Sequence, residues 1–132
     1  MIDLNFTGVE APKFEPIPDG EYRMKLVGLE IKPTKDKANI GANCTYEVTE
    51  QSDGGSEYLG KKVFNWQTIQ GPSVNMGFVK LWLEALTGEE LTSDFTLDPD
   101  QLVGLEVTGF VGTKEYNGND SNYIKYWINP NA

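Results

Sequence analysis

Basic and aromatic residues alternate along one short segment of the sequence, KKVFNWQTI, residues 61–69. If this segment is a β-strand, Lys62, Phe64 and Trp66 project from the same face, because the side chains of a strand alternate between its two faces. Ammonium groups attract phosphates, and aromatic rings provide flat surfaces on which unpaired bases stack. The spacing therefore predicts a surface that binds single-stranded nucleic acid.

The same segment allows a second interpretation, in which its two aromatic residues fill the core and the residues between them face water. Val63, Asn65 and Gln67 would then be the exposed positions. Asn and Gln are poor core residues, which favours this second interpretation and keeps it open beside the first. We assign the basic and aromatic residues to the outward face.

More basic and aromatic residues lie in segments that we expect to flank this strand. KPTKDK places Lys32, Lys35 and Lys37 within six residues, and lysines of this kind neutralise backbone phosphates. Loop lysines are commonly only solvated, but a second predicted loop, GTKEYNGNDS, is also basic and aromatic. The last predicted strand also has an outward basic and aromatic face, with Ile124, Tyr126 and Ile128 on its core face. These two segments add the candidates Lys114, Tyr116, Tyr123, Lys125 and Trp127.

The residue types argue against catalysis. Cys44 is the only cysteine and there is no histidine, which excludes an internal disulfide, a Cys/His zinc site and most pairs of nucleophile and base. Neighbouring acids such as Glu89 and Glu90 lack a patterned set of metal ligands around them. We therefore expect a protein that is not an enzyme and that needs neither cofactor nor metal.

The net charge of −9 disfavours nucleic acid, but the charges are segregated along the chain. No Lys or Arg occurs from Leu81 to Thr113, where acidic residues gather. A domain of this size has a radius of gyration of about 14 Å. The screening length at physiological salt is about 8 Å, so acidic groups on the far side of the domain would be largely screened.

The length of 132 residues predicts one folded domain. Residues 1–19 contain three prolines and are expected to form an extended N-terminal arm, with the domain over residues 20–132. No apolar run approaches the roughly 18 residues that span a bilayer, and the N-terminus lacks the pattern of a secretory signal. We expect a soluble, cytoplasmic protein that does not bind membranes.

Hydrophobic periodicity predicts mostly strands. Alternation of apolar and polar residues indicates strands over 20–32, 39–50, 58–69, 105–111 and 122–128. A phase shift at Val27 and Gly28 predicts a bulge in the first strand. A helix is expected after Ser73, its cap, and before Gly88. Its predicted core stripe comprises Val74, Phe78, Leu81, Trp82 and Ala85. The polar segment 112–121 is expected to be a loop that leaves the body of the fold.

Three strands, one helix and two strands follow the chain order of an OB-fold, a five-stranded, partly open barrel with a helix between strands three and four. A small β-sandwich with an inserted helix is the alternative. An OB-fold binds its ligands on the face of strands two and three, between the loops that join strands one to two and four to five. The basic and aromatic candidates fall on these elements.

The sequence resembles a family of small bacteriophage proteins that are encoded in replication and recombination modules and are related to phage single-stranded DNA-binding proteins. Four segments carry this resemblance, over roughly residues 14–130: PIPDGEYRMKLVGLEIKPTK, YLGKKVFNW, LEALTG and LVGLEVTGFVGTKEYNGNDSNYIKYWINP. The resemblance implies an OB-fold and binding to single-stranded DNA in the cytoplasm of a host cell. It transfers no fixed set of binding residues.

One departure concerns protein partners. Single-stranded DNA-binding proteins of replication commonly end in an acidic tail that recruits partners, whereas this sequence ends WINPNA. Any recruitment of phage or host replication proteins would then fall to the acidic region 84–100. The alternative function is an acidic interaction or inhibitor protein that binds a host or phage protein. The sequence leaves open whether the chain forms a homo-oligomer.

Overall fold

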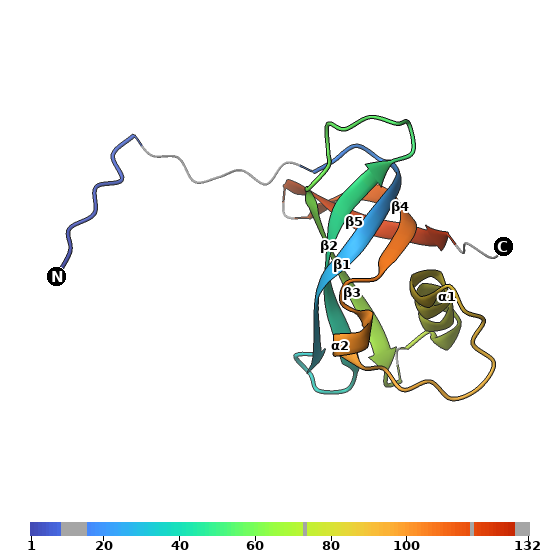
Figure 1. Ribbon diagram of the computed structural model, residues 1–132. Coiled ribbons are helices and arrows are strands. Elements are labelled where there is room, and N and C mark those ends of the chain that lie inside the picture. Colours follow the sequence, from blue (N-terminus) through green and yellow to red (C-terminus); the bar gives the residue numbers. More distant parts are fainter. Residues whose placement is uncertain (9–15, 73, 117, 129–132) are drawn as a thin grey trace.

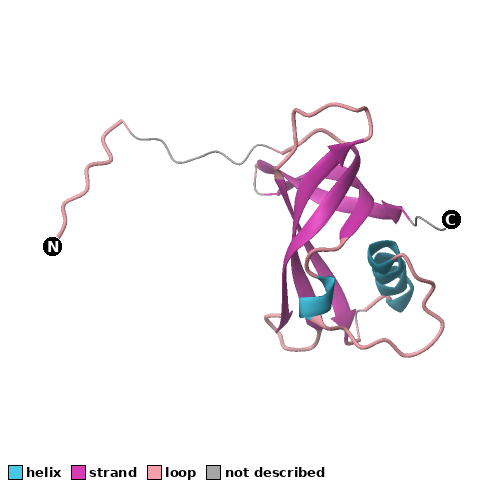
Figure 2. Cartoon of the chain, in the orientation of Figure 1, coloured by secondary structure: helices cyan, strands magenta, loops and turns pink. Residues whose placement is uncertain are grey.

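The computed structural model describes residues 1–8, 16–72, 74–116 and 118–128. Its architecture is mainly β, with one five-stranded antiparallel sheet in the order β3-β2-β1-β4-β5 in the described residues (Figure 1). Two helices lie between β3 and β4, and the connections are loops (Figure 2). The elements are β1 (Gly20–Pro33), β2 (Ile40–Gln51), β3 (Lys62–Gln70), α1 (Met76–Thr87), α2 (Pro99–Leu102), β4 (Glu106–Tyr116) and β5 (Asn119–Ile128).

Strand β1 is long because it serves two neighbours. It pairs with β2 from Tyr22 to Pro33 and with β4 from Gly20 to Lys25. The register against β2 shifts between Leu26 and Gly28, which confirms the predicted bulge. Strands β3 and β5 contact each other, but no hydrogen-bonded ladder joins them among the described residues, so the sheet is not closed into a barrel.

The core centres on Tyr46 of β2 and Trp82 of α1, both fully buried. The indole Nε1–H of Trp82 donates a hydrogen bond to the Tyr46 hydroxyl at 2.9 Å. Trp127 of β5 packs against Tyr46 from another side, with ring centroids 5.5 Å apart. Burial raises the pKa of Tyr46 well above its ordinary value, so this hydroxyl stays protonated.

Helix α1 differs in two details from the expected one. It is capped by Asn75, whose side chain accepts a hydrogen bond from the Phe78 backbone N–H, and the predicted cap Ser73 lies outside the described residues. It ends at Gly88, as predicted, with a φ of 76° that favours glycine. Leu81 is half exposed, so its assignment to the core was wrong. The main buried stripe comprises Val79, Trp82, Leu83 and Leu86, at the spacing of one helix face.

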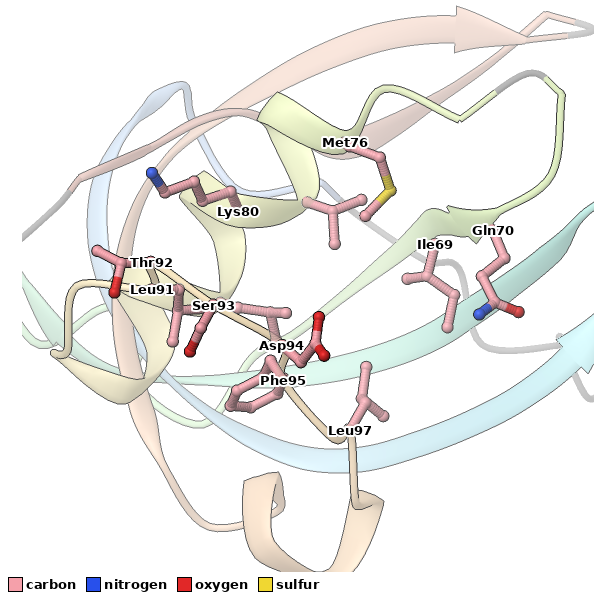
Figure 3. Close-up of a pocket in the computed structure, with 12 residues that line it drawn as sticks. Ile69, Gln70, Met76, Lys80, Leu91, Thr92, Ser93, Asp94, Phe95 and Leu97 are labelled. Atoms are coloured by element: carbon pink, nitrogen blue, oxygen red, sulfur yellow. The ribbon is translucent and has the colours of Figure 1, made fainter.

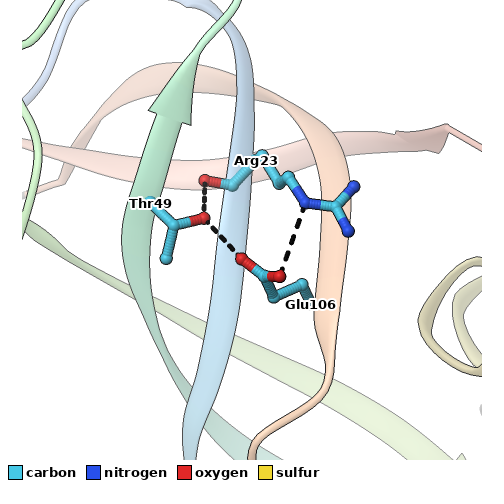
Figure 4. A network of polar contacts seen from close by, with 3 residues as sticks. All are labelled: Arg23, Thr49 and Glu106. Carbon is cyan, nitrogen blue, oxygen red and sulfur yellow. Dashed lines mark hydrogen bonds and ion pairs between the residues drawn. The ribbon is translucent and has the colours of Figure 1, made fainter.

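A polar network ties three strands together on the outer surface (Figure 4). The hydroxyl of Thr49 in β2 donates to the carbonyl of Arg23 or to the carboxylate of Glu106, at 3.2 and 2.9 Å. The Arg23 Nε lies 3.7 Å from the other carboxylate oxygen of Glu106. Both charged side chains are partly exposed, so the pair adds little stability. Arg23 is therefore already paired with an acidic side chain.

The folded body extends back to Ile17, which the sequence assigned to the arm. Ile17 is buried, and its backbone N–H donates to the Asn122 side chain at 2.9 Å, while the Asn122 amide returns a bond to the Ile17 carbonyl at 3.0 Å. Residues 1–8 have no regular secondary structure and are exposed. They run away from the sheet (Figure 1).

The segment between β4 and β5 is a hairpin, and the expected long loop was wrong. Tyr116 pairs with Asn119, so only two residues join the strands. Gly118 adopts a φ of 78°, which glycine tolerates. The Asn-Gly pair in the sequence is a typical signal of such a turn. Among the described residues, no helix has the length and apolar character needed to cross a bilayer.

Candidate nucleic-acid interface

The outer surface of β1, β2 and β3 carries Lys32, Lys62, Phe64 and Trp66 of the predicted site. Residues that pair across neighbouring strands share a face, so the register defines rows of outward side chains. We call this surface the strand face. Its rows, from β1 through β2 to β3, are Lys25, Glu47 and Lys62; Gly28, Thr45 and Phe64; Glu30, Asn43 and Trp66; and Lys32, Gly41 and Thr68.

Trp66 is held against the sheet while remaining accessible. Its ring lies over Gly41 of β2, and a Cβ built on Gly41 would overlap the ring atoms. The indole Nε1–H donates to the Thr68 hydroxyl at 3.2 Å. The residue keeps 40% of its surface exposed. One aromatic face is therefore fixed in position and open to solvent.

Phe64 is the second exposed aromatic side chain of β3. It is 53% exposed, and its row neighbours, Thr45 and Gly28, are small. Val63 and Gln67 point the other way and are buried, so the predicted outward face of β3 is confirmed and the core interpretation was wrong. The buried Gln67 amide donates to the Thr68 carbonyl at 3.1 Å, which explains how a polar side chain is accommodated there.

The strand face has mixed charge. Lys62 lies 3.4 Å from the Glu47 carboxylate, and both side chains are partly exposed. Lys25 and Lys32 are exposed at two corners, and Glu30 is an anion between them. Lys32 belongs to β1 and not to the loop to which the sequence assigned it. The sequence interpretation named neither Lys25 nor Glu30, although the predicted bulge in β1, between them, puts both on this face.

Lys35 and Lys37 lie in a compact turn between β1 and β2. The Thr34 N–H donates to the Asn39 carbonyl and the Lys37 N–H to the Thr34 carbonyl, both at 2.9 Å. The Asp36 carboxylate accepts bonds from the Thr34 hydroxyl and the Ala38 N–H, which lower the pKa of Asp36. Both lysines are exposed at the end of the strand face.

The outer side of the β4–β5 hairpin forms a second basic and aromatic surface. The rings of Phe110 and Tyr126 stack at 5.1 Å with an interplanar angle of 17°, and the Lys125 ammonium lies 5.9 Å from the Phe110 centroid. The Lys114 ammonium lies 5.4 Å from the Tyr123 centroid. We call this surface the hairpin face. The side chain of Tyr116 lies outside the described part.

Two predictions for β5 were wrong, for one reason. The register shifts so that Phe110 pairs with Tyr126 while Val111 pairs with Ile124, and Lys125 is left over. This bulge reverses the alternation after it. Trp127 therefore lies in the core at 8% exposure, and Tyr126, assigned to the core, is 47% exposed. Apart from the aromatic character of Phe110 and Tyr126, nothing in the sequence marks this bulge.

The described residues contain no group of three or more His, Cys, Asp or Glu side chains placed to hold a metal ion. Cys44 is fully buried, and burial raises the pKa of its thiol to about 11. The thiolate is the reactive form of cysteine, so Cys44 is unsuited to nucleophilic chemistry in the folded protein.

Comparison with known proteins gives one finding. A family described as "Protein of unknown function (DUF669)" matches residues 4–126. No curated protein matches the chain.

Proposed function

The chain belongs to the DUF669 family, and we propose that it is a sequence-tolerant single-stranded DNA-binding protein that acts in phage DNA replication or recombination. One observation carries the proposal, namely that the Trp66 ring is fixed over Gly41 with its other face open. A held but exposed indole is a surface for a nucleobase. Stacking of one base on such a ring contributes about 1–3 kcal/mol.

The surroundings of Trp66 favour a single strand over a duplex. Phe64 lies one row away on the same strand, so two neighbouring bases find two rings. Gly28 and Thr45, in the row of Phe64, are small and leave space for a base. Every base has an aromatic face, whereas the bases of a duplex are already stacked. Binding should therefore be tolerant of sequence and weak for duplex.

The strand order supports an OB-type architecture as part of this proposal. A bulged β1 pairs with both β2 and β4, a helix separates β3 from β4, and β3 approaches β5 at an open seam. In an OB-fold the ligand lies across strands two and three. The strand face and the turn that carries Lys35 and Lys37 would then bind one stretch of DNA, with the hairpin face available to further nucleotides.

Titration with poly(dT), followed by intrinsic tryptophan fluorescence, tests the proposal. Trp82 and Trp127 are buried, so a base that quenches emission must stack on Trp66. We expect strong quenching at low salt. A Trp66→Phe variant should lose the quenching but still bind, because phenylalanine retains a stacking surface. Absence of quenching and of any mobility shift at low salt would refute the proposal.

An acidic interaction or inhibitor protein that binds a host or phage protein is the second candidate. The net charge of −9 and an apolar groove beside α1 favour it. The salt dependence of oligonucleotide binding separates the two functions. When a protein binds DNA, counterions are released from the DNA, so its affinity for an oligonucleotide falls as the salt concentration rises. An acidic inhibitor protein should not bind the oligonucleotide at any salt concentration.

A further inference from the structure

An aromatic ring lies over a glycine at two places on the outer surface of the sheet. Trp66 of β3 covers Gly41 on the strand face, and Tyr123 of β5 covers Gly112 on the hairpin face. A Cβ built on Gly112 would lie 2.9 Å from two atoms of the Tyr123 ring, which is closer than a Cβ approaches another atom. Tyr123 pairs with Gly112 across the ladder between β4 and β5 and is partly exposed. Its ring is therefore held against the sheet in the same way as that of Trp66.

The ring of Tyr123 differs from that of Trp66 in carrying a cation. The ammonium group of Lys114, an exposed residue, lies over the Tyr123 ring at 5.4 Å from its centroid. An exposed cation–π contact is weaker than the stacking of a nucleobase on the same ring. A base can therefore replace the ammonium group, which is then free to pair with a phosphate of the same strand.

The other end of the hairpin face is less suited to a base and its phosphate. Phe110 and Tyr126 stack on each other, so each covers one face of its neighbour. Glu21 of β1 is exposed and pairs with Phe110, so this row contains an anion as well as the cation of Lys125. The position for a further base is therefore the end of the face that carries Tyr123.

The open seam separates Tyr123 from Trp66. Strands β3 and β5 contact each other at this seam without a hydrogen-bonded ladder in the described part of the chain (Figure 1). Trp66 projects from the outer side of β3 and Tyr123 from the outer side of β5. A strand of a few nucleotides occupies one of these rings, whereas a longer strand that crosses the seam reaches both. The site of one OB-fold covers about 4–16 nucleotides, a range that includes both cases.

We propose that Tyr123 and Lys114 form a second subsite, which fills only when a strand bound at Trp66 continues across the seam. This subsite rests on the proposed function. A base of the longer strand displaces the Lys114 ammonium from the Tyr123 ring, and the ammonium then pairs with the adjoining phosphate. The second contact is made within one complex, so it raises the affinity through effective concentration. The preferred ligand is accordingly a continuous single strand that spans both faces.

The affinities for oligo(dT) of about 4 and about 16 nucleotides test the subsite. The ratio of the affinity for the longer strand to that for the shorter one should fall at least about fivefold in Tyr123→Leu, the factor that one weak stacking contact contributes. Leucine keeps an apolar cover over Gly112. Trp66→Ala should weaken the binding of both lengths. An unchanged ratio in Tyr123→Leu overturns the subsite and leaves the proposed function intact, whereas a wild-type protein that binds neither length overturns both.

Fluorescence provides the check that Tyr123→Leu is folded. The shorter strand should quench Trp66 in this variant, because it binds the strand face. If Tyr123→Leu abolishes that quenching, the ring supports the fold or the strand face rather than a base, and the subsite is overturned.

Lys114→Gln tests the phosphate contact. For the longer strand, the slope of log affinity against log salt should become shallower by about 0.7, the value for one phosphate. Lys80→Gln is the matched control, because Lys80 is an exposed lysine on another surface. It lines an apolar groove of about 700 Å³ between the end of β3, α1 and the segment 91–97 (Figure 3). Equal slopes in the two variants overturn the role of Lys114.

Photocrosslinking locates the base without reference to affinity. The longer oligo(dT) carries one iodouracil near one end or near the other, and crosslinked peptides are identified by mass spectrometry. At least one of the two probes should crosslink to Tyr123. A short strand with the same label should crosslink to β3. Crosslinks confined to β3 for both long probes overturn the subsite.

Discussion

The ring of Trp66 in β3 lies over Gly41 in β2, in space that only a residue without a Cβ leaves free. The Thr68 hydroxyl holds the indole edge at 3.2 Å. The side chain is thus ordered before a ligand arrives. Preordering lowers the entropy lost on binding, so Gly41 would contribute to the proposed binding by holding the ring in place.

Gly41→Ala should weaken binding to oligo(dT) without unfolding the protein. The new Cβ would occupy the position of the indole ring and force it away from the sheet. We expect the affinity to fall by up to the value of one stacking contact, about 1–3 kcal/mol, with an altered emission maximum of the free protein. Gly28→Ala is the control, because its Cβ would make an ordinary contact with Thr45 at 3.6 Å. Equal affinities of the two variants would contradict the role of Gly41.

Trp66→Ala and Trp127→Ala should have opposite effects. Trp66 is exposed, so its loss should cost binding about 1–3 kcal/mol and leave the melting temperature nearly unchanged. Trp127 is buried against Tyr46, so its loss should lower the free energy of unfolding by about 3–5 kcal/mol. Thermal melting and oligonucleotide titration of both variants check this. A large drop in the melting temperature of Trp66→Ala would remove that residue from the interface.

The three lysines at the end of the strand face should set part of the salt dependence. Lys32→Gln, Lys35→Gln and Lys37→Asn together remove three cations, and Asn suits the φ of 61° at position 37. The slope of log affinity against log salt should become shallower by about 2. Lys80→Gln, on the helix, is the matched control. An unchanged slope in the triple variant would place the DNA backbone elsewhere.

Glu30→Gln should strengthen binding at low salt. Glu30 is an exposed anion in the same row as Trp66, where it would repel a phosphate of the proposed DNA ligand. The gain should shrink as salt rises, because exposed charges are screened. Glu57→Gln removes the same charge away from the strand face and should change affinity little. If both variants bind alike, local charge at position 30 is not the cause.

Alternation alone was sufficient to place the faces of β2. Ala42, Cys44, Tyr46 and Val48 are buried as the period of two predicts, since both faces of β2 are clearly different in polarity. For β3 the sequence left both faces open, because Asn65 and Gln67 are poor core residues, and only the structure shows that Phe64 and Trp66 are exposed. Binding by these residues remains a prediction.

Sequence reasoning failed where a strand changes phase without a glycine to mark the change. The bulge at Lys125 exchanged the positions of Tyr126 and Trp127, and aromatic residues are suited to either environment. The hairpin at Gly118 was missed because the polar composition of 112–121 outweighed its Asn-Gly signal. The contact of Trp66 with Gly41 joins two strands and could not be inferred from either segment alone.

The Cys44 thiol predicts how stability changes at alkaline pH. Burial raises the pKa of Cys44 from 9.0 to about 11 in the folded protein, so the unfolded chain releases this proton first. The contribution of Cys44 to the free energy of unfolding should therefore be constant below about pH 9 and fall as the pH rises toward about 11. Urea unfolding across this window measures it. Cys44→Ala should reduce the slope, whereas an identical slope would assign the effect to other groups such as Tyr46.

Because no hydrogen-bonded ladder joins β3 to β5 among the described residues, β3 is the strand of the proposed interface that opens most easily. Strand β3 is an edge of the sheet, with a hydrogen-bonded ladder to β2 alone among the described residues. An edge strand opens at lower free energy than a strand paired on both sides, so its amide protons exchange with solvent first. Phe64 and Trp66 are thus carried by a strand that local fluctuations reach before they reach β1. A ligand laid across β3 and β2 would suppress those fluctuations, so binding and local rigidity are coupled through the same strand.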